Sequence, residues 1–146
     1  MTSKIRIKAI TVLTDQHLAI TWQNDKQHTV SLHDFITQFV VLKPLLDAAR
    51  FQQAQVGEWG LDVAWGDDVE IAATTLYRLA LEQTGEVMPM NNFKHWMLTN
   101  GLSLTTAAQA LGLSRRTVTA YSSGTALIPK HIGLACKGWD SLHRVA

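Results

Sequence analysis

The stretch 102–124, LSLTTAAQALGLSRRTVTAYSSG, constrains the fold of this chain more than any other part. Its pattern predicts two short helices, because Ser103 and Ser114 are good N-cap residues, each placed directly before a run of helix-forming residues. Between the helices lies Gly112, which can adopt the positive φ that a tight interhelical turn requires. The second helix is expected over Arg115–Ser122.

Two helices that cross at about 90–120° need a small residue at their closest approach and apolar side chains on both sides of the bend. Ala108 is suited to the close approach, and the first helix is expected to end at Leu111. The predicted inward-facing apolar side chains are Ala107, Ala108, Leu111, Leu113, Val118 and Tyr121.

The outward positions of the second helix carry polar side chains. An arginine side chain has two donors that match O6 and N7 of guanine in the major groove, and the methyl groups of Thr119 or Ala120 can contact a thymine methyl. The predicted contacts with bases or phosphates are Arg115, Arg116, Thr117, Thr119 and Ser122.

This segment resembles the helix-turn-helix of lambda-repressor-like (Xre/Cro-type) regulators. The resemblance rests on the spacing of Ala108, Gly112, Leu113, Val118 and Gly124, and it extends more loosely over about 50 residues. It implies that the helix beginning at Arg115 enters the major groove, while the start of the preceding helix contacts the DNA backbone. On that basis further phosphate contacts are predicted at Ser103, Lys94, Lys130 and Lys137.

The segment departs from the family pattern at two positions. Leu104 stands where many relatives have a polar residue that supports base reading, and Tyr121 replaces an acid near the end of the recognition helix. Two alternatives stay open: the segment is a helical hairpin without a role in DNA binding, or it has the regulator fold and serves only protein contacts.

The charge of the chain is divided unevenly. Residues 1–86 hold seven Lys and Arg and eleven Asp and Glu, whereas residues 87–146 hold six basic residues and one acid, Asp140. The net charges are therefore −4 and +5, which fits two domains of which the second faces a polyanion. Chance variation of surface charge is the alternative explanation.

The first half alternates apolar and polar residues, as β-strands do. A helix is expected over residues 35–40, ended by Pro44, and another from Val69 to Gln83 after a cap at residues 66–68. Gly85 and Pro89 mark the boundary between the halves. The expected strands are 5–12, 17–22, 29–32, 51–56 and 61–65, with a hairpin connection at 57–60.

The order of elements over residues 3–82, with its Pro-Leu step at Pro44, Phe51 and a strand ending in Trp65, looks like a widespread bacterial domain family of unknown function. As a whole, the chain is similar to two-domain bacterial proteins of this kind, among them a candidate DNA-binding protein of a nitrifying bacterium. Members of the family also resemble antitoxin-like partners encoded beside small toxin-like proteins.

No catalytic or metal-binding constellation is expected. The six histidines show no metal-ligand spacing with each other or with Cys136, the lone cysteine, which is expected to be a buried structural thiol. Asp67 and Asp68 are interpreted as a turn and a helix cap. Trp59, in a hairpin connection, is either part of the structure or an exposed contact. We expect a protein without cofactors, membrane span or enzymatic activity, in the reducing cytoplasm.

The sequence thus predicts an α+β domain over residues 1–86, with a small, mainly antiparallel sheet and two helices. An all-α, lambda-repressor-like helix-turn-helix domain follows over residues 87–146. The expected function is sequence-specific binding of double-stranded DNA by a homodimer that regulates transcription. The alternative is an antitoxin-like interaction module whose N-terminal domain binds a partner protein, with DNA binding secondary.

Overall fold

The computed structural model describes residues 5–143 and divides the chain into two compact units. Unit 1 comprises Met1–Ala80 and unit 2 comprises Leu81–Ala146, so the boundary lies earlier than the expected residue 86. One contact in unit 2 is consistent with this earlier boundary: the carboxylate of Glu82 accepts a hydrogen bond of 2.9 Å from the backbone N–H of Met90. This bond joins residues before the expected boundary to the first helix after it.

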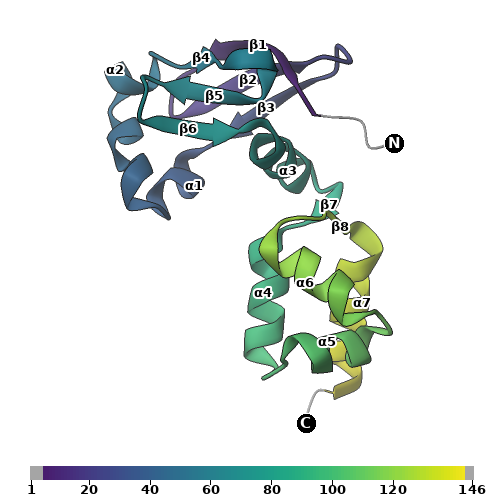
Figure 1. The fold of residues 1–146 in the computed structure, drawn as a ribbon. Coiled ribbons are helices and arrows are strands. Elements are labelled where there is room, and N and C mark those ends of the chain that lie inside the picture. Colours follow the sequence, from purple (N-terminus) through teal and green to yellow (C-terminus); the bar gives the residue numbers. More distant parts are fainter. Residues whose placement is uncertain (1–4, 144–146) are drawn as a thin grey trace. The chain divides into compact units, whose positions relative to one another are not determined.

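Unit 1 contains two small antiparallel sheets and, among the described residues, three α-helices (Figure 1). This agrees with the prediction of an α+β domain, but the expected single sheet with two helices is wrong. The first has the order β1-β2-β3 and the second the order β4-β5-β6. Every second residue of β2 and of β5 is buried, which is the alternation of side chains that β-strands with one face in a core show. The strands are β1 (Ile7–Val12), β2 (His17–Trp22), β3 (Gln27–Ser31), β4 (Gln55–Val56), β5 (Asp62–Trp65) and β6 (Val69–Ala72).

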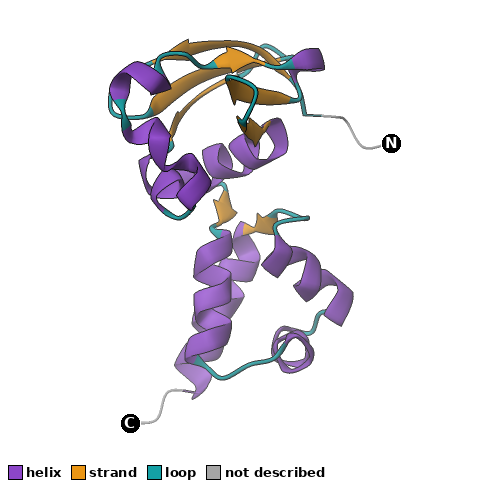
Figure 2. Ribbon diagram, turned by 60° about the vertical axis from the view of Figure 1, so that its left-hand side comes forward, coloured by secondary structure: helices purple, strands orange, loops and turns teal. Residues whose placement is uncertain are grey.

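Helices pack on these strands and share one apolar core with them. In both ribbon views the helices of unit 1 lie mainly on one side of the strands (Figures 1 and 2). Trp65 is fully buried in this core, and its indole N–H donates to the carbonyl of Phe51 at 3.0 Å. The helices are α1 (His33–Thr37), the 3-10 helix η1 (Val40–Leu46), α2 (Ala48–Phe51), the 3-10 helix η2 (Glu58–Gly60) and α3 (Ala73–Thr84).

Three further expectations for unit 1 are wrong. Residues 51–56 are not one strand, because Asp47 caps α2 by accepting from the Arg50 N–H at 3.0 Å, and only β4 is extended. The helix expected from Val69 begins at Ala73, since the preceding residues alternate buried and exposed and pair with β5. Pro44 does not end a helix but lies inside η1, where its carbonyl accepts from the N–H of Asp47.

Unit 2 is mainly helical, with a second apolar core that α4, α5, α6 and α7 share. The expectation of an all-α domain is wrong in one respect, because β7 and β8 form a short antiparallel pair. Its core residues include Phe93, Trp96, Ala107, Ala108, Val118, Tyr121, Ile132 and Cys136. The elements are β7 (Val87–Met88), α4 (Met90–Thr99), α5 (Leu104–Leu111), α6 (Arg115–Ser123), β8 (Ile128–Pro129) and α7 (Lys130–His143).

The start of α4 also differs from the prediction. From the sequence, a helix over 93–100 capped by Asn91 or Asn92 is expected, but Pro89 occupies the N-cap position and no side chain of that residue caps the helix. The carboxylate of Glu82 supplies the missing acceptor for the first N–H of α4. Within the described residues, no helix is both long and apolar enough to cross a membrane.

Candidate nucleic-acid interface

The turn between α5 and α6 has the geometry that the sequence predicts. Gly112 adopts φ 70° and ψ 31°, in the left-handed region, and ends α5. The N–H of Leu113 donates to the carbonyl of Ala108 at 2.8 Å, which is the long-range bond of a Schellman motif. Leu113 packs against the core of unit 2. The turn therefore holds the start of α6 in a defined position relative to α5.

Both predicted N-caps are confirmed. The Ser103 hydroxyl accepts from the N–H of Thr106 at 3.1 Å, and the Thr106 hydroxyl accepts from the N–H of Ser103 at 2.8 Å, so the pair forms a capping box. The Ser114 hydroxyl accepts from the N–H of Thr117 at 3.1 Å. These bonds determine where α5 and α6 begin, and hence which side chains of α6 point outward.

The inward side of α6 is apolar, as predicted. Val118 is fully buried, and Tyr121 is 8% exposed. The ring of Tyr121 meets the ring of Phe93 edge to face, with centroids 5.7 Å apart. Tyr121, one of the two residues that depart from the regulator pattern, thus packs α6 against α4. Leu104, the other departure, is half-buried and packs against the same core.

The outward side of α6 forms a shallow hollow to which two arginines contribute. Arg115 and Arg116 are both exposed there, and within the described residues neither forms an ion pair. No acidic residue lines the hollow. The lining residues are Arg115, Arg116, Thr119, Ala120, Ser123 and Thr125.

Sequence reasoning missed two residues of this hollow. Ser123 and Thr125 lie at its C-terminal end, and their hydroxyl oxygens are 2.7 Å apart. The spacing of Ser123 from Arg116 and Thr119, seven and four residues, is the spacing of one helix face and could have identified it. Thr125 lies after the end of α6, so helical periodicity carries no signal for it.

Two predicted contact residues, Thr117 and Ser122, are not part of the hollow. Both are half-buried. The Thr117 hydroxyl lies 2.9 Å from the Ser114 hydroxyl, and the Ser122 hydroxyl donates to the carbonyl of Val118 at 3.0 Å. Their contacts with DNA stay predictions.

The structure places the other predicted phosphate contacts apart from this hollow. Lys94 is exposed on α4, and Ser103 is engaged as the cap of α5. Lys130 and Lys137, on α7, line a separate cavity that shares no lining residue with the hollow on α6. Contacts of these residues with DNA also stay predictions.

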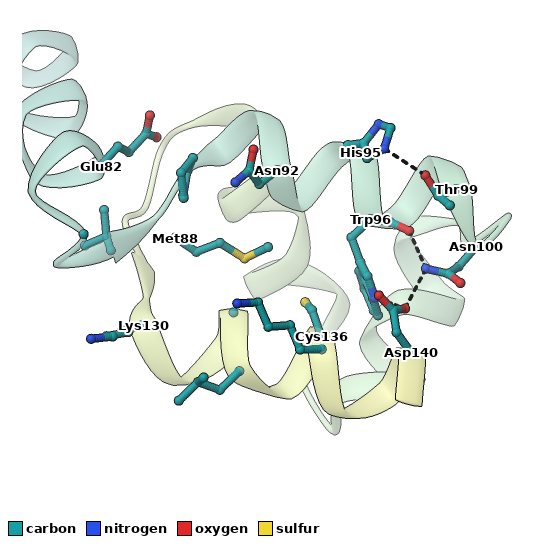
Figure 3. Close-up of a pocket in the computed structure, with 16 residues that line it drawn as sticks. Glu82, Met88, Asn92, His95, Trp96, Thr99, Asn100, Lys130, Cys136 and Asp140 are labelled. Carbon is teal, nitrogen blue, oxygen red and sulfur yellow. Dashed lines mark hydrogen bonds between the residues drawn. The ribbon is translucent and has the colours of Figure 1, made fainter. Parts of the chain in front are cut away.

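The separate cavity has a volume of about 550 Å³ and lies between α4, β7 and α7. Figure 3 shows Lys130 at one end and Asp140 at the other, with Met88 and Cys136 between them. Asp140 accepts hydrogen bonds from the indole N–H of Trp96 at 2.9 Å and from the side-chain amide of Asn100 at 3.0 Å. Asp140, the single acid of residues 87–146, thus holds α4 to α7.

Cys136 is buried beside this cavity, as predicted for a structural thiol. Burial and, to a smaller extent, the nearby charge of Asp140 together raise the pKa of the thiol to about 11. A thiol of this kind is a poor nucleophile at neutral pH. No cluster of three His, Cys, Asp or Glu side chains suited to a metal ion occurs within residues 5–143.

Comparison with known proteins gives two findings. Residues 7–82 match the profile of the family DUF2442, described as proteins of unknown function. Over 98% of its length, the chain is 36% identical to a protein of known crystal structure, the candidate DNA-binding protein NE0471 from Nitrosomonas europaea ATCC 19718. The alignment covers 91% of that protein with a TM-score of 0.59. No curated protein matches the chain.

Proposed function

We propose that this chain, which belongs to the DUF2442 family of proteins of unknown function, binds double-stranded DNA by placing α6 in the major groove. The observation that carries the proposal is the outward face of α6. Two exposed guanidinium groups project there, at the start of a helix whose other side is fixed by Val118 and Tyr121. The α5–turn–α6 arrangement serves as a helix-turn-helix in this proposal, and no catalytic role is assigned to the chain.

The size and chemistry of the face suit a groove of DNA. The major groove of B-DNA admits an α-helix, and arginine paired with guanine is the commonest specific contact in it. Arg115 and Arg116 carry donors that no described residue uses in an ion pair. The Thr119 hydroxyl already donates to the carbonyl of Arg115 at 2.9 Å, so its methyl group is the part that faces a thymine.

Electrostatics supports the same function. Residues 87–146 hold six Lys and Arg and the single acid Asp140. Lysine and arginine side chains that neutralise phosphates release condensed counterions, which provides affinity for DNA of any sequence. The similarity to NE0471, which is itself described as a candidate DNA-binding protein, agrees with this function.

The finer proposal is sequence-specific binding by a homodimer that regulates transcription. Proteins of the helix-turn-helix class commonly bind two half-sites about one helical turn apart, so that the two-fold symmetry of the protein matches that of the site. We therefore expect a palindromic site upstream of a regulated gene. Light scattering after size-exclusion chromatography, with and without DNA, tests the dimer.

Fluorescence anisotropy with a labelled duplex from the region upstream of the chain's own coding sequence tests the proposal. An unrelated duplex of equal length measures binding that does not depend on sequence. We expect Arg115→Ala and Arg116→Ala each to weaken binding to the first duplex by about 1–3 kcal/mol, because each removes a base contact. Lys43→Ala, an exposed lysine in unit 1, is the matched control and should bind like the unchanged chain.

Two results would contradict the proposal. If the double variant of Arg115 and Arg116 is folded by circular dichroism and binds both duplexes as the unchanged chain does, α6 is not the reading helix. If the unchanged chain prefers neither duplex at any salt concentration, sequence-specific binding is wrong and only the electrostatic part of the proposal stands.

A protein-binding role for unit 1 is the second candidate function. The observation that favours it is a run of exposed apolar residues at the start of η1, where Val40 is 80% and Val41 is 61% exposed. Neighbouring Phe39 is also exposed. Exposed apolar residues gathered in one place often mark a protein-interaction site. This candidate corresponds to the antitoxin-like alternative and does not conflict with DNA binding by unit 2.

A further inference from the structure

One edge of the second sheet of unit 1 is unpaired. The sheet has the order β4-β5-β6, so within the described residues β6 has a strand neighbour on one side only. Figure 1 shows β6 at the margin of the strands. A bond from the N–H of Ala73 to the carbonyl of Leu61, 2.8 Å long, continues the β5–β6 register. In an antiparallel pair, successive residues direct their backbone N–H and C=O groups alternately toward the partner strand and away from it. The N–H and C=O of Glu70 and the N–H of Ala72 therefore point away from β5.

An apolar hollow of about 280 Å³ runs along this unpaired edge. Four consecutive residues of the β5–β6 hairpin, 68–71, contribute to its lining. A hollow over one face of a strand would be lined by alternate residues, since successive side chains point to opposite faces. The consecutive lining therefore places the hollow at the edge of β6, where an added strand would lie. Its other wall consists of Phe35, Phe39, Val41, Leu42 and Thr75.

The rim of the hollow is acidic. Asp68 and Glu70 line it, and none of the basic residues among 5–143 does. The negative charge of Asp68 is partly neutralised, because its carboxylate forms an ion pair of 3.2 Å with Arg50. Glu70 is exposed and forms no ion pair within the described residues. A chain that pairs with this edge is favoured if it places a cation opposite Glu70.

We propose that the edge of β6 and its hollow bind an extended segment of another protein, in which basic residues alternate with apolar ones. The segment adds a strand to the sheet next to β6, a mode of recognition in which backbone hydrogen bonds give affinity and pockets for alternate side chains give specificity. Lysine or arginine residues of the segment lie on the same face as Glu70. The apolar residues between them point to the face of Val69 and Ile71, into the hollow.

Charge argues against a second copy of this chain as the occupant. A second copy could pair with this edge through its own β6 strand. If the two strands run antiparallel and pair through their exposed residues, the two Glu70 side chains come close together on one face. Like charges that lie opposite each other across strands are destabilising. β3, an outer strand of the first sheet, has mostly polar residues, and so does the lining of the hollow beside it.

The test uses a short fluorescein-labelled peptide of alternating lysine and valine, and the full chain, in an anisotropy titration. A peptide of alternating glutamate and valine is the charge control. Two further peptides carry backbone N-methyl groups, either on every lysine or on every valine. We expect the segment to run antiparallel to β6, in which case lysines on the Glu70 face direct their N–H groups toward β6. Methylation of the lysines should then weaken binding at least tenfold, and methylation of the valines should change it less than threefold.

Two pairs of variants locate the site. Glu70→Lys should weaken binding of the lysine-valine peptide at least tenfold, while Glu58→Lys, an equal charge change at an exposed residue outside the hollow, should not. Val41→Asp in the hollow should weaken binding, while Leu61→Asp, at another exposed apolar residue of unit 1 that lies outside the lining, should not.

The proposal is overturned if the glutamate-valine peptide binds as well as the lysine-valine peptide. It is also overturned if the two N-methylated peptides lose affinity equally, because strand pairing would then be absent. Equal losses in Glu70→Lys and Glu58→Lys would show attraction by overall charge alone. None of these results depends on DNA binding by unit 2, which the duplex titrations test separately.

Discussion

Replacement of Gly112 by alanine tests whether the bend between α5 and α6 has the described geometry. Gly112 has φ +70°, a conformation that disfavours any residue with a Cβ atom. A Cβ built at this position would meet no atom within 4 Å, so the cost of the substitution comes from the backbone alone. The variant is therefore expected to fold with a weakened α5–α6 bend.

The magnitude follows from two opposing effects. A left-handed alanine costs about 1–2 kcal/mol. Alanine also lowers the conformational entropy of the unfolded chain, which stabilises the folded state by about 0.4–1 kcal/mol. We expect Gly112→Ala to lower the free energy of unfolding of unit 2 by about 1 kcal/mol net.

Gly138 offers the matched control. It lies inside α7, its φ is not positive, and a Cβ there would likewise meet nothing within 4 Å. Alanine is favoured over glycine within a helix by about 1 kcal/mol. Gly138→Ala is therefore expected to stabilise unit 2 by about 0.5–1 kcal/mol. The same substitution should thus lower the stability of unit 2 at Gly112 and raise it at Gly138, although a Cβ atom has free space at both positions.

Hydrogen exchange measured by mass spectrometry suits this test, because a chain of two units need not unfold in one step. Peptides that cover Val118 and Tyr121 report on the opening of unit 2. Their exchange should be about fivefold faster in Gly112→Ala and slower in Gly138→Ala. If Gly112→Ala exchanges as slowly as the unchanged chain, or more slowly, Gly112 is not left-handed and the described turn is wrong.

Three further predictions concern unit 2. Ser114→Ala should cost about 1 kcal/mol of stability in urea unfolding, because the N-terminus of α6 loses its cap. Asp140→Ala should cost about 1–3 kcal/mol, because the donors of Trp96 and Asn100 lose their acceptor, whereas Asp140→Asn keeps an acceptor oxygen and should cost less; equal costs would contradict this role. The raised pKa of Cys136, about 11, means that the unfolded thiol ionises first. The unchanged chain should therefore lose about 2–3 kcal/mol of stability between about pH 9 and pH 11 relative to Cys136→Ala, and parallel pH profiles of the two proteins would refute the assignment.

The sequence was most informative in the 102–124 stretch because local chemistry decides that part of the structure. The caps at Ser103 and Ser114, the turn at Gly112 and the burial of Val118 each depend on a few neighbouring residues. Such signals survive in a single sequence because the bonds that they predict span only a few residues.

The errors in unit 1 have the opposite cause. Residues 69–72 alternate as a strand does, but the run is only four residues long and leads directly into a helix, so the helical pattern that follows is easily extended over it. Pairing with β5, which depends on residues brought together by the 66–68 turn, makes the segment a strand. The acidic hollow beside β6 was missed for the same reason, since its walls come from several segments far apart in the sequence: α1, η1, the β5–β6 hairpin and the start of α3.

The hydrogen bonds of α6 restrict which of its residues can distinguish one DNA sequence from another. The hydroxyls of Thr119 and Ser122 donate to carbonyls of their own helix, and that of Ser123 donates to the carbonyl of Ala120 at 3.3 Å. A hydroxyl has one proton, so each of these residues can offer DNA only an acceptor or a methyl group while its bond persists. Neither Arg115 nor Arg116 is restricted in this way, because no described acid holds it. If α6 reads DNA, guanine recognition must come from these two arginines, and the site should lose its preference for guanine when both are removed.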